Sequence, residues 1–227
     1  MSIIANPLFR KMLISAIVLG AFAIIATSMV AVTFEQTKEQ IAENQKQATL
    51  KSLYQLIKPS RHNNDIFNDT IQVTNLELLG SKNPITIYRA RKDSQPVAAI
   101  LTAIAPDGYT GKITLLVAIN YNGVLAGVRV IKHKETPGLG DVIEIEKSDW
   151  ITQFKNTSLT QPTSKRWKVK RDGGDFDQLT GATITPRAIV KATHKALLFY
   201  KQQRDTLFMK KDNIPNKINS KQSTDNT

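Results

Sequence analysis

The chain has 227 residues, of which 41% are hydrophobic, so it can bury one ordinary core and has little room for a second. It has no cysteine, which excludes disulfides, thiolate metal sites and cysteine-ligated iron–sulfur clusters. Any redox chemistry therefore needs an organic cofactor. The three histidines, His62, His133 and His194, lack metal-ligand spacing, so we expect no metal site.

The net charge of +12 favours anionic partners. Basic clusters are usually solvated faces. The N-terminal apolar run described next predicts a membrane-anchored domain outside the cytoplasm, where no chromosome is present, so we expect no nucleic-acid partner. Membrane lipid headgroups or acidic partner subunits are the more economical explanation for this charge.

Residues 12–34 carry no charge and are numerous enough to span about 30 Å of hydrocarbon as a helix. We therefore expect residues 1–34 to form a cytoplasmic N-terminus and a single-pass anchor. Arg10 and Lys11 precede the run and Glu35 follows it, so the positive-inside rule predicts a cytoplasmic N-terminus. The main domain would then be periplasmic, on the inner membrane of a Gram-negative cell. A cleaved signal peptide, with a weak site at Ala26-Thr27-Ser28, remains an alternative.

The rest of the chain predicts an α+β fold with a mainly antiparallel sheet and packed helices, because strand patterns come first and helix patterns follow. Residues 35–60 should form a helical stalk that ends at Lys58-Pro59-Ser60, and 61–205 the main domain. Tyr121-Asn122-Gly123 is a hairpin signal. Residues 206–227 are polar, and we expect a disordered tail there. The expected strands are 70–79, 85–91, 97–103, 113–119, 124–131 and the short 167–170, and the expected helices are 141–154 and 186–204.

Residues 177–190, DQLTGATITPRAIV, place a glycine-containing turn of hydroxyl residues directly before a helix. Thr185 is a good N-cap, and Pro186 suits the first helical position. The free N–H groups and the positive end of the helix dipole favour an anion, and Gly181 lets the backbone approach it. The run therefore predicts a phosphate site.

Asp177, Thr180, Gly181, Ala182 and Thr183 fit the D-x-x-[ST]-G-A-T pattern of proteins that carry FMN covalently. Residues 167–190 and a second block, residues 133–154, resemble the G subunit of the Rnf (Rsx) electron-transport complex, and the likeness covers roughly residues 10 to 205.

The resemblance implies FMN joined through its phosphate to Thr183 by a separate flavin transferase, which takes it from FAD and reads Asp177 and Thr180. A threonine hydroxyl alone is a weak nucleophile, so its attachment to the phosphate needs the transferase. Thr183 is then a modified side chain and not a catalyst, and we expect no catalytic residue in the chain. The resemblance also implies an electron-relay role in a complex that couples electron transfer between ferredoxin and NAD to ion transport, or that reduces a redox sensor. The other membrane and iron–sulfur subunits of the complex are the implied partners. The second block is implied to lie against the flavin ring, and its site residues would be Glu135, Thr136, Gly138, Leu139 and Gly140.

Three alternatives remain open. The C subunit of the Na⁺-translocating NADH:quinone reductase shares both motifs. An anchored periplasmic binding or scaffold domain without a flavin would carry the same turn unmodified. The second block could be a plain strand-to-helix connection, with Trp150 a core aromatic and Lys147 and Asp149 surface charges.

Overall fold

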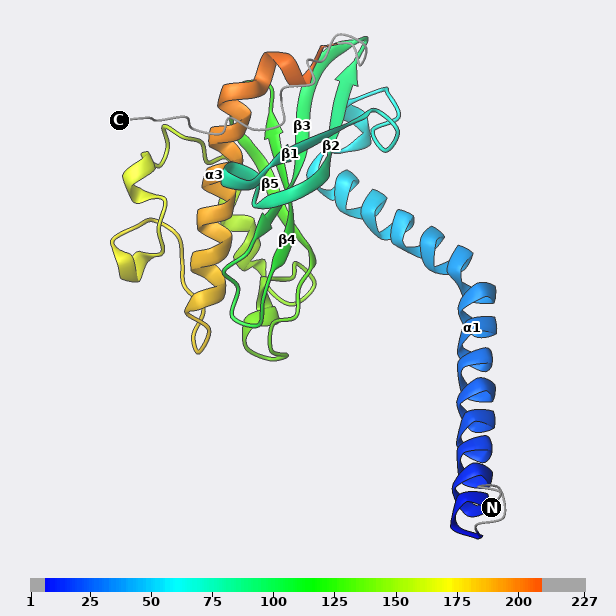
Figure 1. Ribbon diagram of the computed structural model, residues 1–227. Coiled ribbons are helices and arrows are strands. Elements are labelled where there is room, and N and C mark those ends of the chain that lie inside the picture. The colour runs from blue at the N-terminus through cyan, green and yellow to red at the C-terminus, as the bar shows by residue number, and fades with distance from the viewer. Residues whose placement is uncertain (1–6, 210–227) are drawn as a thin grey trace, which may run out of the picture. The chain divides into compact units, whose positions relative to one another are not determined.

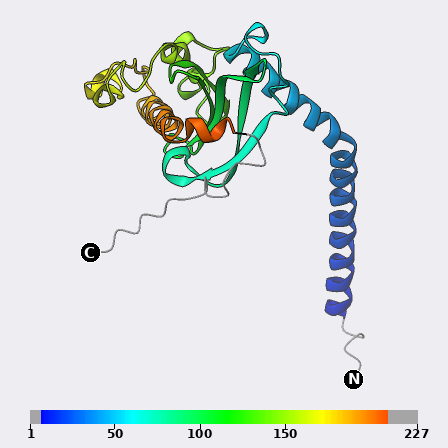
Figure 2. The ribbon, with the colours of Figure 1, turned by 90° about the horizontal axis from the view of Figure 1, so that it is seen from above.

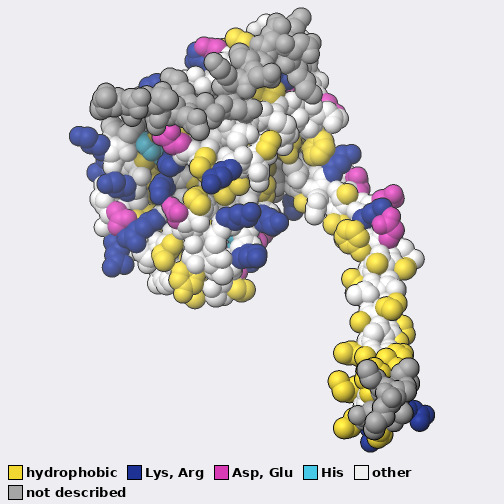
Figure 3. Space-filling model, in the orientation of Figure 1, with side chains coloured by type: hydrophobic (Ala, Val, Ile, Leu, Met, Phe, Trp, Pro, Cys, Tyr) yellow, Lys and Arg dark blue, Asp and Glu magenta, His cyan; other side chains and the backbone are white. Residues whose placement is uncertain are grey.

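The computed structural model describes residues 7–209, which fall into two units, the first ending at Ala48 and the second beginning at Thr49. The first unit is a single stretch of helix α1 (Pro7–Leu56), which continues into the second unit (Figure 1). This helix is long and apolar enough to cross a membrane, and hydrophobic side chains cover much of the part that lies in the first unit (Figure 3). It ends at Leu56, just before Pro59, as the sequence predicts.

The second unit is built on a five-stranded antiparallel sheet in the order β1-β2-β3-β4-β5 (Figures 1 and 2). Each strand pairs with the next along the chain, which confirms the expected antiparallel sheet. Gly123, with φ of 87°, makes the predicted turn between β4 and β5, and its N–H donates to the Asn120 carbonyl at 2.8 Å. The strands are β1 (Thr70–Asn75), β2 (Ser81–Lys92), β3 (Gln95–Ala105), β4 (Ile113–Asn120) and β5 (Leu125–Lys132).

Side chains alternate between the two faces of a strand, and each face of this sheet is covered by its own hydrophobic cluster. On one face, Leu101 and Val117 join the main core with α3 (Ile184–Leu207), which lies along the sheet in Figures 1 and 2. On the other face, Ile100 and Leu116 pack with Leu53 and neighbours in the last turns of α1. The middle strands are therefore buried on both sides and need no polar face.

Three expected elements are wrong in detail. Strand 70–79 stops at Asn75, whose side chain accepts the Leu78 N–H at 2.7 Å and starts the short helix α2 (Leu76–Leu79). Helix 141–154 is replaced by two 3₁₀ turns, η3 (Gly140–Ile143) and η4 (Asp149–Phe154), because Ser148 caps the second. Strand 167–170 reduces to one bridge between Val169 and Phe176. The remaining 3₁₀ turns are η2 (Pro59–Arg61), η5 (Ser164–Arg166) and η6 (Lys170–Asp172).

The end of α3 is fixed to the sheet. Leu207 is buried, and Arg89 of β2 donates to the carbonyls of Leu207 and Met209 at 3.2 and 2.9 Å. The expected tail therefore does not begin at Thr206, since residues 206–209 belong to the packed domain. Residues 210–227, where most of that tail was expected, lie outside the described residues.

Candidate functional site

A cleft of about 470 Å³ opens where three separate segments of the second unit meet. Tyr109 comes from the β3–β4 loop, the second segment follows β5, and the third is the turn that leads into α3. Most residues of both sequence motifs meet here, although they are far apart in the chain. The lining residues are Tyr109, Glu135, Thr136, Leu139, Gly140, Gly181, Ala182, Thr183, Ile184 and Thr185.

The N-terminus of α3 forms one wall of the cleft. Thr183 is the N-cap residue by position, but its side chain makes no capping hydrogen bond, and it lines the cleft half-buried. The expected N-cap at Thr185 is wrong, because this residue lies within the first turn and its hydroxyl donates to Glu135. Pro186 also lies in that first turn, where its missing N–H breaks no helical hydrogen bond. Thus the N–H groups that begin α3 have no side-chain cap from Thr183.

The turn before α3 is tight. Gly181 has φ of 79°, a conformation that favours glycine, and the Ala182 N–H donates to the Leu179 carbonyl at 3.3 Å. A Cβ at Gly181 would lie 3.2 Å from Leu139 across the cleft. The glycine therefore allows the two motifs to approach each other.

Glu135 connects the three segments. Its side chain is buried, with 4% of the residue exposed. One oxygen accepts the Thr110 N–H at 3.0 Å and the other accepts the Thr185 hydroxyl. Glu135 thus lies in the cleft wall, as predicted, but both its oxygens have protein partners.

The two loop glycines have different roles. Gly138 has φ of 78°, and a Cβ there would meet only open space, so its backbone conformation is what favours glycine. A Cβ at Gly140 would lie 2.9 Å from both Cβ and Oε2 of Glu135, and 3.3 Å from Thr185 Oγ1. The missing side chain of Gly140 therefore makes room for Glu135, whereas the sequence suggested close approach to a planar ligand.

A charged network stabilises the segment after β5. His133 accepts the Glu135 N–H on Nδ1 at 3.0 Å, and its Nε2 lies 2.9 Å from Glu144 Oε1. The hydrogen bond from Lys147 lowers the pKa of Asp141 and that of Glu144, while those carboxylates raise the pKa of Lys147. Lys147 is therefore paired within the loop, not a lone surface charge.

Three predicted site residues lie outside the cleft lining. Asp177 is exposed and pairs with Lys170, Thr180 is exposed, and Gly138 is at the loop bend. Trp150 is a core aromatic whose Nε1 donates to the Asp177 carbonyl at 2.8 Å. This hydrogen bond attaches the segment that leads into the turn to the core. The described residues hold no cluster of three or more side chains that could bind a metal.

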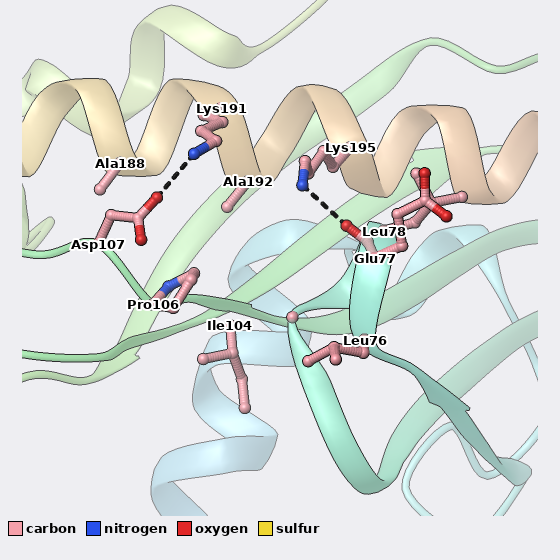
Figure 4. A pocket seen from close by; sticks show the side chains of 11 residues that line it. Leu76, Glu77, Leu78, Ile104, Pro106, Asp107, Ala188, Lys191, Ala192 and Lys195 are labelled. Atoms are coloured by element: carbon pink, nitrogen blue, oxygen red, sulfur yellow. Dashed lines mark hydrogen bonds and ion pairs between the residues drawn. The ribbon is translucent and has the colours of Figure 1, made fainter. Parts of the chain in front are cut away.

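A second hollow lies between α2 and α3 (Figure 4), but its volume is only about 50 Å³. Lys191 on α3 pairs with Asp107 at 2.7 Å, and Lys195 donates to the Glu77 carbonyl at 2.9 Å. Asp107 belongs to the same loop as Tyr109, so the ion pair helps to hold one wall of the larger cleft. We take the larger cleft as the candidate site.

The residues of this cleft fit FMN. Its volume lies within the roughly 300–1,000 Å³ of typical ligand clefts. Tyr109, Leu139 and Ile184 stand at its edge with 68%, 47% and 46% of their surface exposed, and they offer apolar contact to a planar ring. The uncapped start of α3, beside the Thr183 hydroxyl, suits a phosphate.

Comparison with known proteins is consistent with this fit. The FMN-binding domain family matches residues 108–198, which contain the whole cleft, and the RnfG N-terminal region matches residues 1–56. The G subunit of the ion-translocating oxidoreductase complex from Pseudoalteromonas atlantica is 44% identical over 194 residues, which cover 86% of this chain and 90% of that protein. Its counterpart from Pseudomonas aeruginosa is 46% identical over 198 residues, covering 87% and 92%. The chain belongs to this G-subunit family.

Among solved structures, the crystal structure of Shewanella oneidensis NqrC is similar, with 20% identity and a TM-score of 0.43 over 65% of this chain and 74% of that one. The match to the RnfG N-terminal region and the two G-subunit relatives favour the G subunit over the C-subunit alternative.

Three residues of the G-subunit cleft were missed in the sequence. Tyr109 lies on a loop with no motif of its own, and only the sheet brings it to the site. Ile184 and Thr185 stand inside the recognised run, but they were assigned to the helix start alone. Their position directly after Thr183 was the available signal.

Proposed function

We propose that FMN is covalently bound to Thr183 through its phosphate, and that the chain is an electron-relay subunit of an ion-translocating oxidoreductase complex. The observation that carries this proposal is the position of Thr183, which lines the cleft at the start of α3 without a side-chain capping bond. A hydroxyl in that position can carry a phosphoester, and the helix N-terminus stabilises its negative charge.

Bound FMN would supply the electron-transfer chemistry, and the protein would supply its binding and orientation. The chain's own residues would hold the ring. Leu139, Ile184 and Tyr109, which line the cleft, would offer it apolar contact. A covalent link prevents loss of the cofactor from an exported protein and fixes its distance from neighbouring redox centres.

The main domain lies on the periplasmic side of the inner membrane in this proposal, since the basic residues precede the only candidate span among the described residues. The partners are the other membrane and iron–sulfur subunits, as implied by the names of the relatives and by the motifs. A flavin transferase acts during maturation, and Asp177 and Thr180, which are exposed beside the cleft, are accessible for its recognition.

Substitution of the acceptor tests the linkage. The full chain co-expressed with the transferase should show flavin fluorescence in a denaturing gel, and Thr183→Val should abolish it while the protein stays folded and anchored. Thr180→Val is the matched control, because it removes a hydroxyl of the same turn from outside the cleft lining, and it should lower the yield without abolishing it. A colourless wild-type protein would instead favour the non-redox scaffold.

A further inference from the structure

The surroundings of Glu135 are built to hold a carboxylate at one place. A Cβ at Gly108 would lie 3.0 Å from one of its oxygens, and a Cβ at Gly140 would lie 2.9 Å from the other. These glycines come from different segments of the cleft wall. These glycines leave the space that the carboxylate occupies, and burial together with a hydrogen bond to each oxygen holds it there.

The two hydrogen bonds of this carboxylate span the cleft. Thr110 is 25 residues away in the chain and Thr185 is 50 residues away. Glu135 therefore fixes the first turn of α3 relative to the β3–β4 loop.

The threonines of the turn differ in availability. Thr180 is exposed and outside the cleft lining. Thr185 lines the cleft, but it is 1% exposed and its hydroxyl is bound to Glu135. Within residues 7–209, the Thr183 hydroxyl has no hydrogen-bond partner and is half-buried in the cleft. Of the three, Thr183 alone is both in the described cleft and free.

We propose that Glu135 is a positioning residue for cofactor attachment: its bonds to Thr110 and Thr185 present Thr183 to the cleft and withhold Thr185. This inference rests on the proposed linkage at Thr183. In the transfer, the Thr183 oxygen bonds to the flavin-side phosphorus of FAD, the bond between the two phosphates breaks, and AMP leaves. The hydroxyl proton passes to a base of the transferase, and no group changes oxidation state.

Two pairs of variants separate the hydrogen bonds from the bulk of the side chains. Thr185→Val removes the hydrogen bond between Thr185 and Glu135, and Glu135→Ala removes this bond together with the one from Thr110. Thr185→Ser keeps the donor, and Glu135→Gln keeps both contacts, because its carbonyl can accept from Thr110 while its amide donates to the Thr185 hydroxyl. Glu146→Gln is the matched control, since Glu146 belongs to the same segment but is exposed, pairs with Lys51 and lies outside the cleft lining.

The readout is the fraction of the tryptic peptide 172–187 that carries FMN shortly after induction of the transferase, measured in the full chain. We expect a fall of about fivefold in Thr185→Val, the ratio produced by one lost hydrogen bond, and a fall at least as large in Glu135→Ala, which loses two. The Thr185→Ser, Glu135→Gln and Glu146→Gln variants should stay within about twofold of wild type on the same scale. Hydrogen exchange of the flavin-free chain should rise over residues 184–190 only in Thr185→Val and Glu135→Ala, and over residues 106–112 only in Glu135→Ala.

The outcomes are distinct. A wild-type peptide without FMN at Thr183 contradicts the linkage itself. If wild type is modified and folded Thr185→Val reacts at the wild-type rate, the positioning role is overturned. FMN on Thr185 in Glu135→Ala would support it, because the freed hydroxyl has then become an acceptor. Should Glu135→Ala not fold, Thr185→Val decides, since valine has the shape of threonine.

Discussion

Replacing Gly140 with alanine tests the packing of the cleft wall directly. The added Cβ would lie 2.9 Å from the Cβ and Oε2 of Glu135, whereas ordinary contacts begin at 3.4 Å, so the atoms must separate by about 0.5 Å. Overpacking of this kind costs about 1–3 kcal/mol. The displaced carboxylate should also loosen its bond to Thr110.

Unfolding of the full chain in detergent gives the magnitude. The chain has only two tryptophans, Trp150 and Trp167, both buried in the second unit, so their fluorescence follows unfolding of that unit. Gly140→Ala should lower the free energy of unfolding by about 1–3 kcal/mol and raise hydrogen exchange over residues 106–112.

Gly138→Ala is the control. It should also destabilise the protein, by about 1–2 kcal/mol, because its φ of 78° disfavours a side chain. Exchange over residues 106–112 should remain as in wild type, since nothing lies close to the new methyl group. A Gly140→Ala protein within about 0.5 kcal/mol of wild type, with unchanged exchange, would refute the packing argument.

Further predictions concern charge and topology. Asp141 and Glu144 have lowered pKa values in the folded state, so their pairing with Lys147 stabilises the protein above the unfolded-state pKa values and is lost as pH falls through the folded ones. The difference in the free energy of unfolding between wild type and Lys147→Met should therefore be constant from pH 7 to about 5 and shrink below about pH 4. Urea unfolding at each pH measures it. A constant difference down to about pH 3 would contradict the pairing. Arg89→Met removes a buried guanidinium that holds the end of α3 and should lower the free energy of unfolding by about 1.5–3 kcal/mol in the same assay; no loss would show that the contact is dispensable. Alkaline phosphatase fused after Met209 should be active, and an inactive fusion beside an active cytoplasmic reporter would reverse the topology.

Much of the fold follows from local patterns. The strands of the sheet were predicted because short runs rich in apolar and β-branched residues persist over their length, and helix α3 because its apolar residues keep helical spacing. Gly123 marked one hairpin. The wrong boundaries come from single side chains that bond the backbone. Asn75 ends β1 by capping α2, and Ser148 starts a new turn within an expected helix.

The site was predictable in part. The motif residues gave the turn and the loop, and most of them meet in the cleft. The partners of Glu135 could not be read from the sequence, because Thr110 and Thr185 reach it only through the folded sheet and helix. For the same reason, Gly140 was assigned to a ligand when its neighbour is a carboxylate of the chain.

The mass of one tryptic peptide tests the central proposal most directly. Cleavage after Arg171 and Arg187 releases residues 172–187, which include Thr180, Thr183 and Thr185. In wild-type protein co-expressed with the flavin transferase, this peptide should carry one FMN, and fragmentation should assign it to Thr183. An unmodified peptide, or FMN on Thr180 or Thr185, would contradict the proposed attachment.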